Sequence, residues 1–336
     1  PIDVKEEVLQ KMATPMIGHR GKDASMLQKS ISEKMQKLFY TNNTILLSTS
    51  SGTGLMEGSI RSCTSKKAAV FSCGSFGDRW YKMAVANNVP ADIFKVELGE
   101  ATTPEMVDKV LSTGEYDLIT VTHNETSTGI RNPIEEIGEV VKKYEDVIYC
   151  VDTVSSAGGI KVEVDKIGID ICITSAQKAL GLPPGMSIST FSQKAIDRAK
   201  QVPFRGVYLD LLAMYEYLIK KNYQYPSTPS LSHMFALDFQ LDNILDEGLD
   251  NRFNRHEDMA NLVRNWAKKH FQIFTNENHL SNTLTVIENT QGISVSNLNS
   301  KLQERGFQIA NGYGDLKEKT FRISHMGDYT VEDVQE

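Results

Sequence analysis

The sequence has few cysteines, and no two of them have the spacing of a metal or redox motif. Only four occur in 336 residues, Cys63, Cys73, Cys150 and Cys172, and none forms a C-x-x-C pair. Cys150 and Cys172 fall inside apolar runs, where a small buried hydrophobic side chain is the ordinary role. This distribution argues against a disulfide framework, and we expect inert thiols in a reducing compartment and no metal site.

Long apolar runs and clusters of basic residues are also missing. No stretch approaches the ~20 apolar residues of a membrane span, and the first residues lack a signal pattern. The 43 Asp and Glu outnumber the 36 Lys and Arg, for a net charge of −7, and no basic run interleaved with aromatic residues is present. We therefore expect a cytoplasmic protein without nucleic-acid or membrane partners. The chain starts at Pro1 without Met and stops at Glu336 in a helix-like pattern, so both ends are expected to be incomplete.

Short β-forming runs alternate with amphipathic segments along the first two thirds of the chain. Such alternation predicts an α/β fold, with a mostly parallel sheet covered by helices on both faces and ligands beyond the carboxyl ends of the strands. A long helix from about Phe235 to Phe271 and a smaller α+β pattern follow. We therefore expect a large domain over residues 1–235, whose first residues could join the small domain, and a small domain over 236–336. The expected strands are 44–48, 68–71, 118–122, 147–151, 169–174, 284–287 and 321–324.

An aspartate and a lysine lie near the ends of two consecutive strands of the predicted sheet. Asp152 ends one apolar run, and Lys178 comes 26 residues later, just past the next. Taken alone, each would be an ordinary turn or surface residue. Together they are what pyridoxal phosphate (PLP) requires: an amine that forms a Schiff base with the aldehyde, and a carboxylate that keeps the pyridine nitrogen protonated. This pair makes an enzyme the leading hypothesis.

Three further segments lie where the sheet rule places a ligand. The turn Ser51-Gly52-Thr53 follows a strand and precedes a helix, so its N–H groups and hydroxyls could meet an anion, although a plain turn would look the same. Phe76 lies between nearby glycines and could approach a flat ligand or pack in the core. The polar segment 123–129 follows a strand and reads equally as a ligand site or a capped turn.

These segments together resemble the class V aminotransferases of PLP fold type I, most closely the alanine-glyoxylate/serine-pyruvate branch. The resemblance covers nearly the whole chain. It runs through Met16-Ile17-Gly18-His19-Arg20, Ser51-Gly52-Thr53, Glu125-Thr126-Ser127-Thr128-Gly129, Val151-Asp152-Thr153-Val154-Ser155-Ser156, Ser175-Ala176-Gln177-Lys178-Ala179 and Phe321-Arg322-Ile323.

The resemblance implies a role for each matching residue. Lys178 would bond covalently to PLP, and Asp152 would pair with the ring nitrogen. Arg322 would bind the substrate carboxylate through a fork of two hydrogen bonds, although alone it would read as a surface ion-pair residue. The remaining implied cofactor contacts are Ser51, Gly52, Thr53 and Gln177 at the phosphate, Phe76 and Val154 on the two ring faces, Thr126 near the ring hydroxyl, and Tyr225 and Thr228 reaching the phosphate from the neighbouring subunit of a homodimer.

Two departures from the family pattern are visible. Many relatives have serine where this chain has Ala176, and some have tryptophan at the position of Phe76. Neither change removes a reacting group, so altered cofactor affinity is expected while the chemistry is retained. The family's Gly-Pro segment, which borders the substrate pocket, is absent from these residues.

The expected activity is ping-pong transamination from a small amino acid, alanine or serine, to a 2-oxo acid, glyoxylate or pyruvate. A PLP lyase such as a cysteine desulfurase or selenocysteine lyase has the same fold. That reaction needs a nucleophilic cysteine near the substrate, and none occurs after Cys172. An aminotransferase acting on ureidoglycine also fits the pattern. A non-catalytic PLP-binding regulatory module would be expected to carry a DNA-binding segment, and none is seen.

Overall fold

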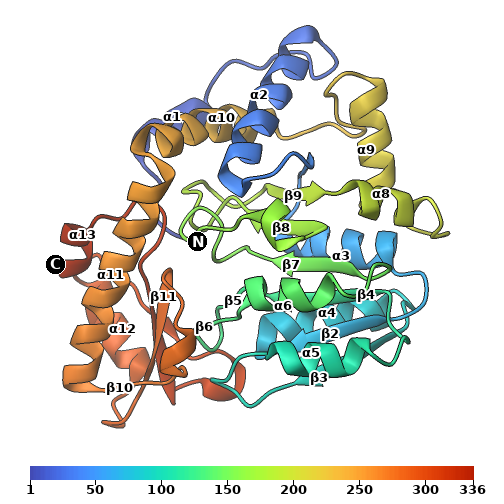
Figure 1. Cartoon of the computed structure of the whole chain (residues 1–336). Coiled ribbons are helices and arrows are strands. Elements are labelled where there is room, and N and C mark those ends of the chain that lie inside the picture. The colour runs from blue at the N-terminus through green and yellow to red at the C-terminus, as the bar shows by residue number, and fades with distance from the viewer.

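The computed structural model describes residues 1–336 and contains a large mixed sheet, a small antiparallel sheet and the helices that cover them (Figure 1). The helices are α1 (Glu6–Met12), α2 (Lys22–Phe39), α3 (Gly52–Cys63), α4 (Ser75–Ala86), α5 (Pro104–Leu111), α6 (Ile134–Val141), α7 (Val164–Ile167), α8 (Gln193–Ala199), α9 (Leu211–Lys220), α10 (Leu231–Glu247), α11 (Leu249–His270), α12 (Val295–Gln303) and α13 (Val331–Gln335). The strands are β1 (Thr44–Ser48), β2 (Ala68–Ser72), β3 (Ala91–Lys95), β4 (Leu118–Thr122), β5 (Asn124–Glu125), β6 (Ile130–Arg131), β7 (Ile148–Asp152), β8 (Ile171–Ser175), β9 (Ser187–Phe191), β10 (Gln272–Ile273), β11 (Leu284–Glu288), β12 (Ala310–Asn311) and β13 (Thr320–Ser324).

The large sheet has seven strands in the order β1-β9-β8-β7-β4-β2-β3. Only β9 runs against its neighbours, β1 and β8, so the other six strands point the same way. The expected α/β class with a mostly parallel sheet is confirmed. Because these six strands share a direction, the residues that follow β1, β2, β4, β7 and β8 meet at one edge of the sheet.

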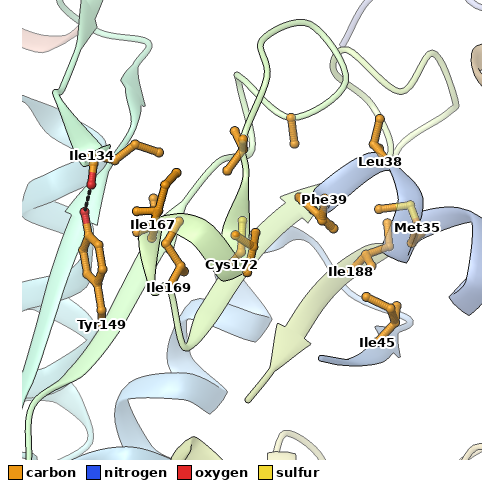
Figure 2. Packing of buried hydrophobic residues seen from close by; sticks show 14 of the residues in the cluster. Met35, Leu38, Phe39, Ile45, Ile134, Tyr149, Ile167, Ile169, Cys172 and Ile188 are labelled. Atoms are coloured by element: carbon orange, nitrogen blue, oxygen red, sulfur yellow. Dashed lines mark hydrogen bonds between the residues drawn. The ribbon is translucent and has the colours of Figure 1, made fainter. Parts of the chain in front are cut away.

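Helices bury both faces of this sheet, and each strand contributes side chains to both faces because successive side chains point to opposite sides. In β7, Tyr149 and Val151 belong to one apolar cluster, whereas Ile148 and Cys150 belong to the other. The first cluster is covered by α1, α2, α5, α6, α7 and α10, and the second by α3, α4, α8 and α9. Figure 2 shows part of the first cluster, where Phe39 and Met35 of α2 lie near Ile45 and Ile188.

One polar group is satisfied inside this apolar layer. The hydroxyl of Tyr149, fully buried, donates to the carbonyl of Ile134 at 3.2 Å (Figure 2). A buried hydroxyl without an acceptor would be costly, so this bond allows a tyrosine at a core position.

The prediction of one long helix from about Phe235 to Phe271 is wrong, because the chain forms two helices there, α10 and α11. Gly248 separates them with a φ of 83°, a left-handed conformation that glycine adopts without a steric penalty. α10 packs against α1 and α2 and contributes to the core of the large sheet, whereas α11 packs against the small sheet. We propose that the domain boundary, expected at 235/236, lies nearer Gly248.

The small sheet has the order β10-β11-β13-β12 and is antiparallel throughout. It lies with α11, α12 and α13 beside the large sheet, in orange and red in Figure 1. The expected strands 284–287 and 321–324 are its two central strands. This arrangement places β13 and its Arg322 close to the carboxyl edge of the large sheet.

All four cysteines are buried and unpaired. Burial raises the pKa of Cys172 to about 12 and raises the pKa of the other three thiols as well. The expectation of unreactive thiols is consistent with these environments. No helix is long and apolar enough to cross a membrane.

Candidate active site

Asp152 and Lys178 lie at the carboxyl edge of the large sheet, as the sequence predicted. Asp152 is the last residue of β7, and Lys178 follows the neighbouring strand β8 by three residues. The charge of each side chain affects the pKa of the other. The two groups that the sequence paired are therefore neighbours in space.

The Asp152 carboxylate is buried without a cationic partner. Its side chain is 4 % exposed and accepts one hydrogen bond, from the backbone N–H of Val154 at 2.8 Å. Burial raises the pKa of Asp152 to about 6, and the nearby Glu125 carboxylate acts in the same direction. A buried carboxylate with one hydrogen bond is suited to receive a cationic N–H, such as that of a pyridinium ring.

The Lys178 amine is likewise without an acidic hydrogen-bond partner. Burial lowers the pKa of Lys178, the nearby Arg322 guanidinium lowers it further, and Asp152 opposes both. A lysine whose pKa is lowered carries a larger fraction of neutral, nucleophilic amine at neutral pH.

The turn after β1 has free hydrogen-bond donors. Ser51 occupies the N-cap position of α3, but its side chain makes no capping hydrogen bond, so the first N–H groups of the helix are not satisfied by it. The Gly52 N–H donates to the Ser175 hydroxyl at 3.2 Å, which brings the turn against the end of β8. A Cβ at Gly52 would lie 2.7 Å from Cγ2 of Val154, so only glycine allows this approach.

Phe76 is held at the first turn of α4 by a buried carboxylate. Glu125, fully buried, accepts hydrogen bonds from the backbone N–H groups of Phe76 and Gly77 at 3.0 and 2.9 Å. It also accepts from the Ser127 hydroxyl at 2.6 Å. A carboxylate at a helix N-terminus is favoured by the helix dipole, and here it joins the segment 123–129 to Phe76.

Thr126 and Arg322 connect the two sheets. The Thr126 hydroxyl lies 2.7 Å from the Ser155 hydroxyl, and its carbonyl accepts from Nη1 of Arg322 at 3.3 Å. Arg322 also donates from Nε to the carbonyl of Asn311 at 3.0 Å and lies 5.6 Å from the ring centroid of Tyr313. No carboxylate pairs with Arg322, so its charge is available to a carboxylate ligand.

Tyr225 and Thr228 lie on the link before α10. Tyr225 is 4 % exposed and lies beside Ser48 and Thr49 at the start of the turn, whereas Thr228 is exposed. Arg20, from the Gly-His-Arg stretch, donates to the carbonyls of Tyr225 and Pro226 and so fixes this link. That these two residues serve a neighbouring subunit stays a prediction.

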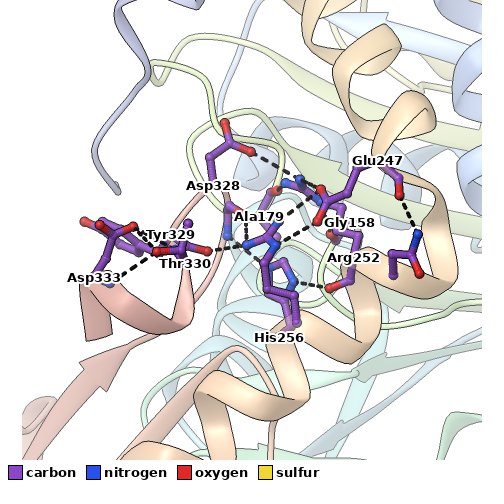
Figure 3. A network of polar contacts seen from close by, with 12 residues as sticks. Gly158, Ala179, Glu247, Arg252, His256, Asp328, Tyr329, Thr330 and Asp333 are labelled. Atoms are coloured by element: carbon purple, nitrogen blue, oxygen red, sulfur yellow. Dashed lines mark hydrogen bonds and ion pairs between the residues drawn. The ribbon is translucent and has the colours of Figure 1, made fainter. Parts of the chain in front are cut away.

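The loop that carries Lys178 is held by a buried arginine of α11 (Figure 3). Arg252, 1 % exposed, donates from Nη2 to the carbonyl of Ala179 at 2.7 Å and from Nε to the carbonyl of Gly158 at 2.8 Å. Its Nη1 lies 2.8 Å from Glu247 and 3.2 Å from Asp328. The residue after Lys178 is thereby fixed to α11.

The residues present fit PLP. Three groups meet at one edge of the sheet: the Asp152 carboxylate and the Lys178 amine, which form no ion pair, and the turn before α3, where the Ser51 side chain does not cap the helix N–H groups. The Oε1 atom of Gln177 is buried without a partner, which indicates that this amide lacks part of its native surroundings. Sequence reasoning gave no role to Glu125, Arg79, Arg252 or Tyr313, since their functions depend on contacts between distant segments.

Comparisons with known proteins agree with this geometry. The profile of the family described as Aminotransferase class-V matches residues 5–336. An uncharacterised aminotransferase of Methanocaldococcus jannaschii is 43 % identical over 335 residues, covering 97 % of this chain and 86 % of that protein. The serine-glyoxylate aminotransferase of Arabidopsis thaliana is 28 % identical, covering 97 % of this chain and 84 % of that protein.

A solved structure extends the similarity to three dimensions. The alanine-glyoxylate aminotransferase of Nostoc sp. superimposes with a TM-score of 0.94 at 26 % identity, covering all of this chain and 90 % of that one. The family profile spans nearly the whole chain, and the fold agrees with it. The chain therefore belongs to the class V aminotransferases, and its cofactor is pyridoxal phosphate.

Proposed function

We propose that the protein transfers the amino group of a small amino acid, alanine or serine, to a small 2-oxo acid, glyoxylate or pyruvate, by a ping-pong mechanism. The observation that carries the proposal is the meeting of a buried acid, Asp152, and a partly buried amine, Lys178, neither of which forms an ion pair, with an unpaired Arg322 beside them. Relatives whose names include glyoxylate as acceptor support the choice of oxo acid.

Each residue has a distinct task in this proposal. When bound, PLP supplies an aldehyde that joins amines covalently and a ring that takes up the electrons released at the substrate Cα. Lys178 would hold the cofactor covalently, and its amine, once freed by the donor amine, would act as the base that takes the proton from the substrate Cα. Asp152 keeps the ring nitrogen protonated, and Arg322 orients the substrate carboxylate.

The remaining predicted contacts position the cofactor. Ser51, Gly52, Thr53 and Gln177 would bind its phosphate, and Thr126 would lie near the ring hydroxyl. Phe76 and Val154 would cover the two ring faces. Together these contacts would hold the cofactor between the turn after β1 and the end of β7, with its aldehyde toward Lys178.

The cysteine environments favour transamination over a lyase reaction. A desulfurase needs an accessible thiol near the substrate, and all four thiols here are buried with raised pKa values. We propose in addition a homodimer in which Tyr225 and Thr228 approach the neighbouring phosphate. Sedimentation should then give twice the chain mass of 37.5 kDa, and a monomer at micromolar concentration would contradict it.

The test is a half-reaction without an acceptor. Holoenzyme mixed with alanine or serine should form one oxo acid per site, with loss of the aldehyde form of the cofactor, and added glyoxylate should restore that form. Lys178→Ala should bind PLP weakly and fail in both halves. Release of sulfide from cysteine over many turnovers without an oxo acid would instead support the lyase. If no small amino acid converted the aldehyde form of a correctly loaded cofactor, the proposal would be wrong.

A further inference from the structure

Arg79 is a cation that forms no ion pair and lies beside the turn predicted to bind the cofactor phosphate, near enough to Asp152 that its charge lowers the pKa of that acid. It lies on α4, one residue beyond Asp78, and its side chain is partly buried. None of the ion pairs in the structure includes it. Its one hydrogen bond runs from Nη1 to the hydroxyl of Thr53 at 3.0 Å.

The position of this guanidinium is fixed from two sides. Thr53 is in the first turn of α3, whose N-terminus has free N–H donors. On the other side, the guanidinium carbon lies 4.7 Å from the ring centroid of Phe76, a cation–π contact. Arg79 thus joins the residue predicted to stack on the cofactor ring to the turn predicted to bind its phosphate.

A phosphate group is an anion, so a cation that forms no ion pair beside the predicted phosphate site is a candidate to bind it. A phosphate monoester carries a charge of about −1.5 to −2 at pH 7. The predicted phosphate contacts of this chain, Ser51, Gly52, Thr53 and Gln177, are all neutral, and Lys178 is occupied by the aldehyde. Arg322 lies at the Thr126 end of the site.

We infer that Arg79 supplies the positive charge for the cofactor phosphate and orients the Thr53 hydroxyl toward it. Because that hydroxyl accepts a hydrogen bond from Arg79, its own proton is free to be donated to a phosphate oxygen. The unused N–H groups of the guanidinium can donate to the same anion. This inference rests on the proposed cofactor site.

The experiment compares PLP with pyridoxal, which has the same ring and aldehyde but no phosphate. Apoprotein of Arg79→Met, Arg79→Lys and the wild type is titrated with each aldehyde, and the dissociation constants are read from the absorbance of the bond to Lys178. Lys82→Met is the matched control, because Lys82 is exposed on the same helix three residues away.

Arg79→Met should weaken PLP binding by about 10- to 100-fold, the loss expected for a charge-assisted contact, and leave pyridoxal binding within about 2-fold. Arg79→Lys should recover part of the PLP affinity, and Lys82→Met should change neither constant. Inorganic phosphate should compete with PLP for the wild type and much less for Arg79→Met.

Two results would overturn the inference. Equal weakening of PLP and pyridoxal by Arg79→Met would mean that the residue only supports Phe76 and the fold. Unchanged PLP affinity would mean that its charge does not reach the phosphate. Neither result would contradict the proposed cofactor site at Lys178. If the wild-type apoprotein formed a covalent bond with neither PLP nor pyridoxal, both the proposed cofactor site and this inference would be wrong.

Discussion

Asp152 and Lys178 are kept in surroundings that a purely structural role would not favour. Burying a carboxylate or an amine that forms no ion pair is costly, and the cost appears as a raised pKa for the acid and a lowered pKa for the amine, although their mutual attraction opposes both shifts. Groups perturbed in this way cluster at functional sites. A bound pyridinium and a covalent bond to the amine would relieve both costs.

Asp152→Asn tests the acid. The substitution keeps the size of the side chain and removes its charge, so the ring nitrogen loses the partner that keeps it protonated. We expect a fall in kcat of about 100-fold or more, with PLP still bound at Lys178. The measurement is steady-state kinetics with saturating alanine and glyoxylate, alongside the cofactor content. A variant with nearly full kcat would show that Asp152 is not the ring partner.

The residues of the site differ in how far sequence could identify them. The positions of Lys178 and Asp152 at the sheet edge were predictable because Asp152 ends one recognisable strand and Lys178 follows the next. Arg79 was not, because its role depends on a contact with Thr53, 26 residues earlier in the chain. Glu125 was part of a recognised motif, but its bonds to the N–H groups of α4 appear only in three dimensions.

Helix α11 is bonded both to the loop that contains Lys178 and to the segment that follows β13. Arg252 bonds to Gly158 and Ala179 of the large domain, while His256, one turn later, accepts from the N–H of Gly327 at 3.1 Å (Figure 3). Arg255 donates to the carbonyls of Gly327 and Tyr329. These bonds make α11 a rigid support for both the loop after β8 and the segment after β13.

Arg252→Met should destabilise the protein by about 3–5 kcal/mol, because the buried carbonyls of Gly158 and Ala179 lose a charged donor and two acids each lose one of their donors. The midpoint of urea unfolding measures this. Lys200→Met, which breaks the exposed pair with Asp197, is the control and should leave the midpoint unchanged. If the two variants unfolded alike, the network in Figure 3 would not be the support described.

Several elements could not be predicted, for reasons visible in their residues. β9 consists of Ser187, Ile188, Ser189, Thr190 and Phe191, so it forms no apolar run, although all five residues are buried. β3 lies at the edge of the sheet and carries Asp92 and Lys95. The division between α10 and α11 depends on one left-handed residue, Gly248, within an otherwise helical pattern. In contrast, the strands leading to the site have mostly apolar residues and were predicted to within two residues at each end.

Across the whole molecule, three histidines are buried in the neutral form. Burial lowers the pKa values of His123, His256 and His325 to about 3, from 6.5. In the unfolded chain they take up protons near pH 6.5, so below that pH the unfolded state binds more protons and the free energy of unfolding falls. Asp152 acts in the opposite direction, since its folded pKa of about 6 exceeds the ordinary 3.8, and Glu125 and Glu135, whose pKa values burial also raises, act with it.

The three histidines outweigh the three acids, so the apoprotein should lose stability as the pH falls below about 6.5. We expect the free energy of unfolding to be lower by about 4 kcal/mol at pH 5 than at pH 7.5. Urea titrations at several pH values measure it. His123→Gln should reduce the change by about 2 kcal/mol, the contribution of one such histidine. A stability that stayed constant from pH 7.5 to 5 would mean that these histidines are not held neutral.

The most direct measurement of the central claim is chemical trapping of the cofactor. Apoprotein is incubated with PLP, reduced with borohydride and digested, and the phosphopyridoxyl group is located by mass spectrometry. We predict one group per chain, on Lys178, with none on Lys178→Ala and full labelling of Asp152→Asn. A label on another lysine, or equal labelling of Lys178→Ala, would contradict the account.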